Sequence, residues 1–498
     1  MKRNTILFIC IAALFSVLCL SAKAQPKSVL RPVYAKVACN VLKNMESAEI
    51  AGLAQKGEPM LLLRPAFSFI TDTTKIDMFK VRLDDGTTGY IYSKYLTFDK
   101  DEAKERYMPD FYDPLYKKAK NNFGGGDPMG CDYYLREKPV FENNVMPEAC
   151  YSLYLTSSYA VLKNIDAYIA LAKQTKINTF VIDLKEDGLP GYKADAMKKY
   201  APSAYNRAQD NEQLYRDVVA KLHDNGFWVV GRIVTFKDYH FTKDNPDCAL
   251  WDKAAGTMLY HNKSNWPSAY SRRVWEYNVA LAKESVEKFG LNEINFDYVR
   301  FPDRMQSIEN SIEMRNTYRE SKVQAIQRFV TYAVDELHKL GVYVSIDVFG
   351  EAANPGYTTA YGQYWPAISN VADVMSGMPY PDHFTNGYYG IQKPWNHPYE
   401  IMKAWGARVQ ARQAETPSPA IVRTWVQAYH VMKHVDRNGI DYDAENVEKE
   451  IRGLYDADLT GGYVTWLSSS NIERYRMQAA AFNIDYYKVW LSRKTADK

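Results

Sequence analysis

The chain has 498 residues, more than one ordinary domain contains, and its formal net charge is only +3. Hydrophobic residues make up 46% of it and aromatic residues 14%, which is enough to build a large packed core. The sequence contains no long basic run, which excludes the usual composition of nucleic-acid-binding proteins and of polybasic membrane-binding segments.

Residues 1–24 have the three parts of a secretory signal peptide. Lys2 and Arg3 form a basic start, an apolar run extends over residues 6–20, and the small residues that follow predict cleavage after Ala24. The run is shorter than the ~20 residues that a membrane-spanning helix needs. Cleavage would remove three basic residues and no acidic ones, so the mature net charge would be 0. We therefore expect a secreted or periplasmic protein with no membrane span and no nucleic-acid partner.

Four cysteines follow the expected cleavage site. None of them belongs to a C-x-x-C pair, and no group of cysteine and histidine residues has the spacing of a zinc site, so we expect neither a metal nor another cofactor. In an exported protein Cys131 and Cys150 could form a disulfide, and the sequence leaves this open. The four residues are Cys39, Cys131, Cys150 and Cys248.

Residues 29–98 are expected to form a small all-β domain. Short β-rich runs alternate there with turn signals, and the Asp-Gly pair at 85–86 is typical of a hairpin. The last run has Gly89 before an aromatic-rich strand and a Tyr-Leu pair at 95–96, and it resembles the closing strand of bacterial SH3 domains. That resemblance implies binding of cell-wall peptides. A spacer domain without a ligand is the alternative.

Residues 99–150 are charged, then glycine-rich and then irregular, which predicts a linker that packs on the next domain. From residue 151 to residue 485 the pattern becomes regular, with amphipathic helical segments between most of the β-like runs. These eight runs cover residues 151–158, 178–187, 227–236, 293–302, 342–351, 373–384, 420–429 and 461–471.

Eight alternating units favour an α/β fold of the (β/α)₈ (TIM) barrel type, preceded by the small all-β domain. A doubly wound parallel sheet is the alternative. The number of units favours the barrel, and so do the polar residues at the C-terminal end of nearly every predicted strand, because barrel active sites lie at that end.

Side chains from several predicted strand ends are therefore expected to converge on one substrate-binding site. Aromatic faces stack on sugar rings, so Tyr380, Trp425 and Trp466 are expected to line the opening together with Asp183 and Arg232. The full set of predicted substrate-binding residues is Asp183, Lys185, Arg232, Arg300, Tyr380, Asp382, His383, Trp425, Gln427 and Trp466.

Two aspartates are the candidate catalytic residues. Side chains two residues apart on a strand share a face, and this alternation predicts that Asp297 and Asp347 both point into the barrel. An ionised carboxylate buried without a partner costs several kcal/mol, so it is normally paired or functional. Cleavage of a glycosidic bond needs two carboxyl groups, one as nucleophile or base and one as an acid with a raised pKa. The alternative is that each aspartate forms a structural pair with Arg232 or Arg300.

Residues 151–485 resemble a bacterial family of glycoside-hydrolase-like (β/α)₈ barrels of unknown function. The motifs that carry the resemblance are FDYVRFP at 296–302, SIDVFG at 345–350 and MPYPDHF at 378–384. The family is distantly similar to the α-amylase-type barrels, whose nucleophile is an aspartate at the end of the fourth strand, which implies Asp297. The acid in those relatives is a glutamate at the end of the fifth strand. This chain has Asp347 there and Glu351 one turn later, so the resemblance leaves two candidates for the acid.

The sequence therefore predicts an exported glycoside hydrolase that acts on a polysaccharide or a cell-wall glycan. A non-catalytic protein that binds carbohydrate or cell wall is the main alternative, and an amidase acting on wall peptides is a third. The carboxyl groups of Asp297 and Asp347 would be roughly 5–5.5 Å apart in a retaining enzyme and roughly 6.5–9.5 Å apart in an inverting one. A barrel plugged by an Arg–Asp pair, without a cleft, would favour the binding protein.

Overall fold

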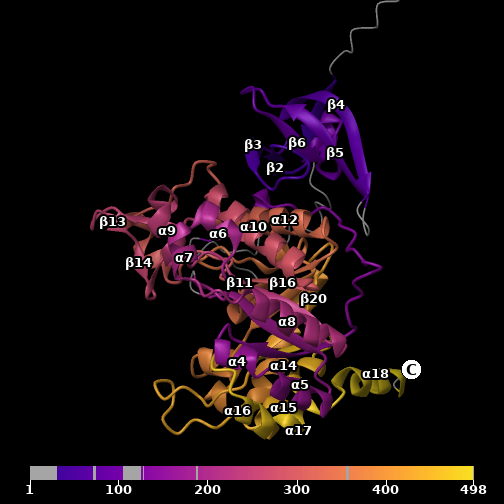
Figure 1. Ribbon diagram of the computed structural model, residues 1–498, viewed down its shortest axis with the longest axis vertical. Coiled ribbons are helices and arrows are strands. Elements are labelled where there is room, and N and C mark those ends of the chain that lie inside the picture. The colour runs from indigo at the N-terminus through magenta and orange to yellow at the C-terminus, as the bar shows by residue number, and fades with distance from the viewer. Residues whose placement is uncertain are drawn as a thin grey trace, which may run out of the picture.

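The computed structural model describes residues 31–70, 75–104, 125–126, 128–186, 189–354 and 358–496. The expected signal peptide, residues 1–24, lies outside these ranges. An antiparallel all-β region comes first along the chain, and a barrel of parallel strands surrounded by helices follows it (Figure 1). The fold class predicted from the sequence, a (β/α)₈ barrel after a small all-β unit, is confirmed.

The N-terminal region is one antiparallel sheet of seven strands in the order β3-β2-β6-β5-β4-β1-β7. The hairpin between β5 and β6 turns at Gly86, whose φ of +88° is a conformation that glycine adopts without strain. Asp85 supports this turn by accepting a hydrogen bond from the Thr87 N–H at 2.8 Å. The likeness to an SH3 domain stays a prediction. The strands are β1 (Pro32–Ala35), β2 (Cys39–Leu42), β3 (Ile50–Ala54), β4 (Pro59–Ile70), β5 (Lys75–Arg82), β6 (Thr88–Tyr92) and β7 (Leu96–Thr97).

Eight parallel strands form the barrel, and their order around it follows their order in the chain. The seventh strand is divided at Arg423 into β20, which pairs with β19, and β21, which pairs with β22. Because β22 also pairs with the first strand, β8, the sheet closes on itself. The strands are β8 (Cys150–Leu155), β9 (Thr179–Glu186), β11 (Trp228–Val234), β16 (Glu293–Asp297), β18 (Tyr343–Phe349), β19 (Val374–Met378), β20 (Ile421–Val422) with β21 (Thr424–Gln427), and β22 (Gly462–Trp466).

Amphipathic helices cover the outside of the barrel, as their sequence periodicity predicts. Helix α12 (Lys322–His338) begins with a capping box between Ser321 and Gln324, and α10 (Arg272–Phe289) ends at Gly290, where φ is +74°. The other principal helices are α4 (Tyr159–Lys163), α5 (Ile165–Lys173), α6 (Asp195–Tyr200), α7 (Pro202–Arg207), α8 (Glu212–Asp224), α9 (Tyr239–Asp244), α13 (Trp365–Ser369), α14 (Pro398–Ala414), α15 (Ala444–Tyr455), α16 (Ile472–Met477), α17 (Ala479–Phe482) and α18 (Tyr486–Ala496).

Between β11 and α10 the chain adds a set of very short strands, and Figure 1 shows β13 and β14 projecting from the side of the barrel. A hydrophobic cluster that includes Trp266 and Ile312 holds this insertion together. Its strands are β12 (Trp251–Asp252), β13 (Thr257–Met258), β14 (Tyr260–His261) and β15 (Ser264–Asn265), and β17 (Ile312–Glu313) from a later loop pairs with β12.

Hydrogen bonds that are buried or partly buried fix the all-β region to helix α12 of the barrel. Tyr95 Oη donates to the Asp335 carboxylate at 2.9 Å, and Tyr332 Oη donates to the carbonyl of Ala48. Tyr95 and Asp335 are both buried, so this contact is an integral part of the fold.

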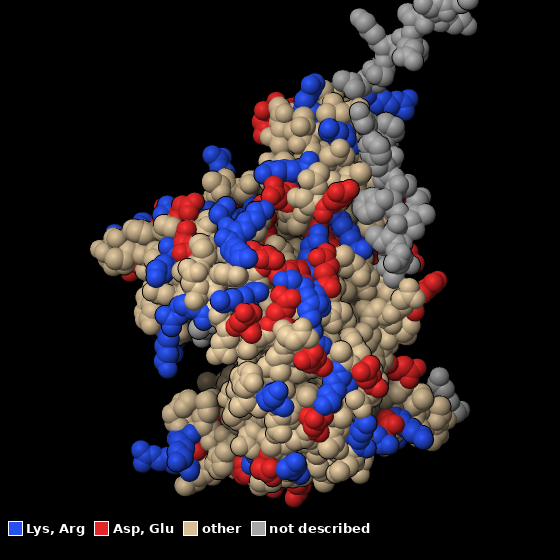
Figure 2. Space-filling model, viewed as in Figure 1, with Lys and Arg blue, Asp and Glu red and all other residues tan. Residues whose placement is uncertain are grey.

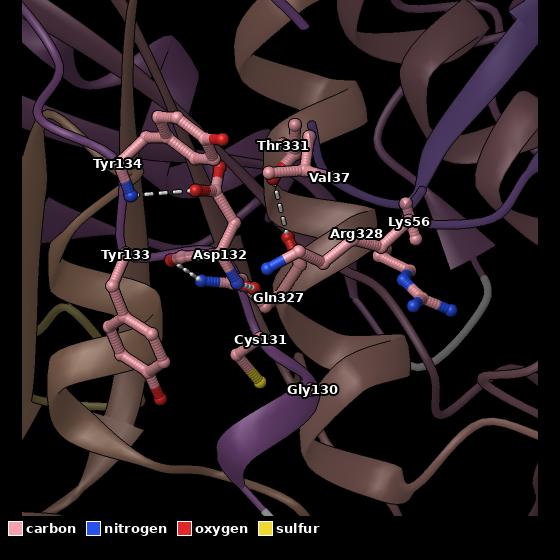
Figure 3. A pocket seen from close by; sticks show the side chains of 11 residues that line it. Val37, Lys56, Gly130, Cys131, Asp132, Tyr133, Tyr134, Gln327, Arg328 and Thr331 are labelled. Carbon is pink, nitrogen blue, oxygen red and sulfur yellow. Dashed lines mark hydrogen bonds between the residues drawn. The ribbon is translucent and has the colours of Figure 1, made fainter. Parts of the chain in front are cut away.

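The irregular segment that leads into the barrel is packed into the same junction. Figure 3 shows residues 130–134 beside α12, where the Asp132 N–H donates to Gln327 at 2.6 Å and Gln327 Nε2 donates back to the Asp132 carbonyl at 2.6 Å. The cavity between these residues holds only about 20 Å³, so little more than a water molecule fits there.

All four cysteines in the described ranges are free thiols, so the disulfide that the sequence left open between Cys131 and Cys150 is not formed. None of the described helices combines the length and the apolar character that crossing a bilayer requires. On the face drawn in Figure 2, acidic and basic side chains are interspersed, in keeping with the small net charge.

Candidate active site

A cavity of about 200 Å³ lies at the C-terminal ends of the barrel strands. It shares Phe349, Met378 and His383 with a wider cleft of about 950 Å³, so the two form one groove. The predicted site residues in the wall of the smaller cavity are Arg232, Asp297, Arg300, Tyr380, His383, Trp425 and Trp466.

Arg232 forms the base of this cavity and is bound by three carboxylates. Its Nη1 donates to Asp183 at 2.6 Å and to Glu186 at 2.7 Å, and its Nη2 donates to Asp297 at 2.5 Å. Burial alone would lower the pKa of Arg232, but the negative charges around it, Asp183 first, raise that pKa well above its ordinary value. The guanidinium is therefore permanently charged and orders the acidic groups around it.

Asp183 lies deepest of the three carboxylates and is fully buried. The Tyr154 hydroxyl donates to it, and Tyr215 Oη donates to its backbone carbonyl at 2.7 Å. Burial raises the pKa of Asp183 from 3.8 to about 7, against the opposing effect of Arg232. Asp183 thus supports Arg232 from below and does not line the cavity.

The raised pKa of Asp183 gives the stability a defined pH dependence. The folded chain keeps a proton on Asp183 that the unfolded chain loses near pH 4, so the contribution of this proton to stability is complete below pH 4 and is lost as the pH rises to about 7. We expect the unfolding free energy of the wild type, minus that of Asp183→Asn, to fall between pH 4 and pH 8. Urea denaturation of both proteins at several pH values measures this difference. The exposed Asp210→Asn is the control, and a difference for Asp183→Asn that does not vary with pH would contradict the assignment.

Asp297 stands at the end of β16, beside Arg232 and at the cavity wall, with 5% of its surface exposed. Its second carboxylate oxygen accepts a hydrogen bond from the Tyr298 N–H at 2.6 Å. Tyr298 has a φ of +52°, a left-handed conformation that is costly for a bulky residue. The strained turn aims this N–H at the carboxylate and holds Asp297 in one orientation. Asp297 pairs with Arg232, not with Arg300, which was the other partner considered from the sequence.

Asp347 points into the barrel next to Asp297, as the alternation along β18 predicts, but no part of it is exposed. One oxygen accepts hydrogen bonds from Asn295 and from the Trp425 indole, each at 2.8 Å. The other oxygen has no hydrogen-bond partner among the described residues and lies 3.9 Å from Arg232 Nε. Burial, and next the charge of Asp297, raise the pKa of Asp347 well above 3.8.

Aromatic rings form one wall of the cavity. The Trp466 ring lies 5.6 Å from that of Trp425 and 6.5 Å from that of Tyr380, and the guanidinium of Arg232 is 5.5 Å from its centre. Such a wall offers flat apolar faces beside the polar base, and flat faces are what sugar rings pack against.

The remaining predicted residues lie further along the groove. Glu351 lines the wider cleft and accepts a hydrogen bond from the Tyr361 hydroxyl. His383 borders both cavities, and burial lowers its pKa below 6.5. Asp382 is mostly occupied by the fold, because it accepts hydrogen bonds from Tyr429 Oη at 2.9 Å and from the Met432 N–H at 3.2 Å. Gln427 is buried and accepts from the Asp382 N–H at 3.3 Å, so it helps to fix this loop.

Lys185 lies apart from the other predicted residues, and Glu186 takes the place expected for it. The register of β9 shifts by one residue beside β11, where Arg232 pairs with Asp183 but Ile233 pairs with Lys185. This bulge adds one residue to β9, so the side chains after it point to the opposite face of the sheet from the one that regular alternation predicts. Lys185 therefore points outward, where it is fully buried and donates to Asp238 and Asn278, each at 2.8 Å. Glu186 stands at the predicted end of this strand but was not among the predicted site residues, because nothing local in the sequence marks the bulge.

Comparisons with known proteins give one family match. The family model described as "Putative glycosyl hydrolase domain" matches residues 152–472. A comparison with curated proteins gives no match.

The solved structures that this chain matches include a hypothetical protein from Ruminiclostridium thermocellum, with 33% sequence identity over 39% of this chain and 97% of that chain and a TM-score of 0.33. The PgaB (BpsB) glycoside hydrolase domain from Bordetella bronchiseptica has 12% identity over 67% of this chain and 98% of that chain, with a TM-score of 0.46. A β-N-acetylhexosaminidase from Bacteroides fragilis has 14% identity over 71% of this chain and 72% of that chain, with a TM-score of 0.43.

Proposed function

Because this chain belongs to the family described as "Putative glycosyl hydrolase domain", we propose that it is an exported enzyme that hydrolyses glycosidic bonds in a polysaccharide or cell-wall glycan. The observation that carries the proposal is the position of Asp297, which is held by Arg232 and by the Tyr298 N–H at the wall of an aromatic-lined cavity. Export rests on the predicted signal peptide at residues 1–24, and its test is cleavage after Ala24.

Asp297 is proposed as the nucleophile or base. A carboxylate in that role must be ionised, accessible to the sugar and held in one direction. Arg232 and the Tyr298 N–H hold Asp297 in one direction, and the cavity gives access to it. Neighbouring aromatic faces would support a sugar ring above the carboxylate.

Glu351 is proposed as the acid in preference to Asp347. A general acid must come within hydrogen-bond distance of the glycosidic oxygen. Glu351 lines the open cleft, whereas Asp347 has no exposed surface and already binds Asn295 and Trp425. Asp347 then serves as a positioning residue that holds Trp425 in the aromatic wall.

Two kinds of substrate test this assignment. We expect Glu351→Gln to slow hydrolysis of an unactivated glycan by about 100-fold or more, because general acid catalysis contributes roughly 10²–10⁴-fold. An aryl glycoside with a nitrophenolate leaving group needs no protonation, so its cleavage should change far less. The substrate is first found by screening the purified protein against a polysaccharide panel that includes bacterial cell envelopes.

Asp347→Asn is the matched comparison, since asparagine keeps an oxygen that can accept the two hydrogen bonds. We expect it to slow both substrates to a similar extent. If Asp347→Asn instead affects only the unactivated glycan while Glu351→Gln affects both alike, the two roles are reversed.

A non-catalytic glycan-binding protein is the second candidate, and the buried pair between Arg232 and Asp297 is the observation that favours it. A carboxylate satisfied by an arginine can be purely structural. The cavity above the pair supports the hydrolase, because a purely structural pair does not require one. Binding of a glycan from the panel without release of reducing ends would support the binding protein.

A further inference from the structure

Arg300 is a second arginine at the cavity, and its surroundings differ from those of Arg232. It follows Asp297 by three residues, lines the same cavity and has 5% of its surface exposed. Four aromatic rings surround its guanidinium at distances to the ring centres of 4.5 to 5.8 Å. These rings belong to Phe349, Tyr298, Trp266 and Tyr361.

The hydrogen bonds of Arg300 are few for a buried arginine. Among the described residues, its single hydrogen bond is the one from Nη1 to the Phe301 carbonyl at 3.0 Å, although a guanidinium carries five N–H groups. The nearest carboxylate, Asp303, is 3.8 Å away, beyond hydrogen-bond distance, and is already bound by Asn262 and by His261 at 3.2 Å. The aromatic rings hold the cation in place and leave most of its donors available.

The acidic groups nearby do not cancel this charge. Asp297 and Glu186, the two carboxylates in the cavity wall, are both bound to Arg232. Asp347 has no exposed surface and does not line the cavity, so an anion in the cavity does not contact it. An anion that enters the cavity therefore meets acidic groups that are already bound to Arg232, and a guanidinium whose one neighbouring carboxylate, Asp303, lies 3.8 Å away and is not hydrogen-bonded to it.

We propose that Arg300 binds the carboxylate of an acidic sugar, so that the substrate class is a uronic-acid-containing glycan. This inference rests on the function proposed above and narrows its substrate. A guanidinium offers two parallel N–H donors that match the two oxygens of a carboxylate, and such charge-assisted pairs are stronger than neutral hydrogen bonds. The aromatic rings exclude water from the pair and pack against the sugar ring that carries the acid.

Binding measurements by calorimetry test the proposal. The probes are tetragalacturonate and a hyaluronan tetrasaccharide, each compared with its carboxyl-reduced form, and a sulfated carrageenan tetrasaccharide. We expect at least one carboxylated probe to bind more tightly than its reduced form. Arg300→Met is expected to weaken that binding by about 10- to 100-fold, the range for a lost hydrogen-bonded charge pair, and to leave binding of the reduced form unchanged.

Arg304→Met is the matched control, because Arg304 is an exposed arginine at the edge of the wider cleft. It should leave the preference for the carboxylated probe intact. Equal binding of carboxylated and reduced probes, tighter binding of the sulfated probe, or a preference that survives Arg300→Met would each overturn the proposal. Binding is measured without turnover, so Arg300-dependent binding with no hydrolysis would refute the proposed hydrolase and not this inference. Hydrolysis that is equally fast for carboxylated and carboxyl-reduced glycans would refute this inference and not the proposed hydrolase.

Discussion

Replacing Asp297 with asparagine is expected to reduce hydrolysis of any glycan that the protein cleaves by at least about 1,000-fold. Asparagine has nearly the same shape but carries no charge, so it can neither attack an anomeric carbon nor activate water. The initial rate of reducing-end release measures the loss. The single side-chain oxygen of asparagine can accept the hydrogen bond from Arg232 or the one from the Tyr298 N–H but not both, so we expect the melting temperature to fall by several degrees while the protein stays folded.

The combination of these two results separates catalysis from structure. Asp210→Asn, at an exposed position, controls for the effect of the substitution itself and should keep full activity. If Asp297→Asn remains fully active, or if it unfolds the protein, then Asp297 is a structural partner of Arg232 and the proposed mechanism is incorrect.

The largest loss of stability is expected from Arg232→Met. Methionine fills much of the same volume but leaves Asp183 and Asp297 without their cation. Removing one partner of a buried ion pair costs about 3–5 kcal/mol, and Arg232 is 2% exposed, so solvent cannot replace it. Urea denaturation should show this decrease in unfolding free energy, and activity should be lost as well because Asp297 is no longer oriented.

A double mutant identifies the cause of that loss. If unpaired buried charge is responsible, then adding Asp297→Asn to Arg232→Met removes a stranded carboxylate and should recover part of the lost stability. The exposed Arg304→Met should change the unfolding free energy little. A variant Arg232→Met as stable as the wild type would show that water or a rearrangement replaces the guanidinium, and the account of the cavity base would have to be abandoned.

Part of the candidate site could be predicted because it depends on regular strands. On β16 and β18 the alternation of side chains holds without interruption, so the inward direction of Asp297 and Asp347 follows from counting residues. On β9 the bulge beside Arg232 adds one residue. Regular alternation therefore predicted Lys185 as the next inward-facing residue after Asp183, whereas in the barrel that residue is Glu186. A bulge depends on how two strands pair, and a single sequence does not record that pairing.

The sequence by itself determined the fold class. A strand or a helix that buries one face must repeat its apolar residues with the period of that element, so both kinds of element can be recognised, and a chain with eight strand–helix units has few ways to arrange its sheet. It also determined which strand ends carry acidic and aromatic residues. Only the tertiary structure decided the partners of the two arginines: Arg232 binds three carboxylates, whereas Arg300 keeps most of its donors available. It also decided the exposure of the two candidate acids, since Asp347 is enclosed and Glu351 faces the cleft. The partners and the exposure of a side chain depend on residues that are distant along the chain, and their positions are fixed only when the barrel closes.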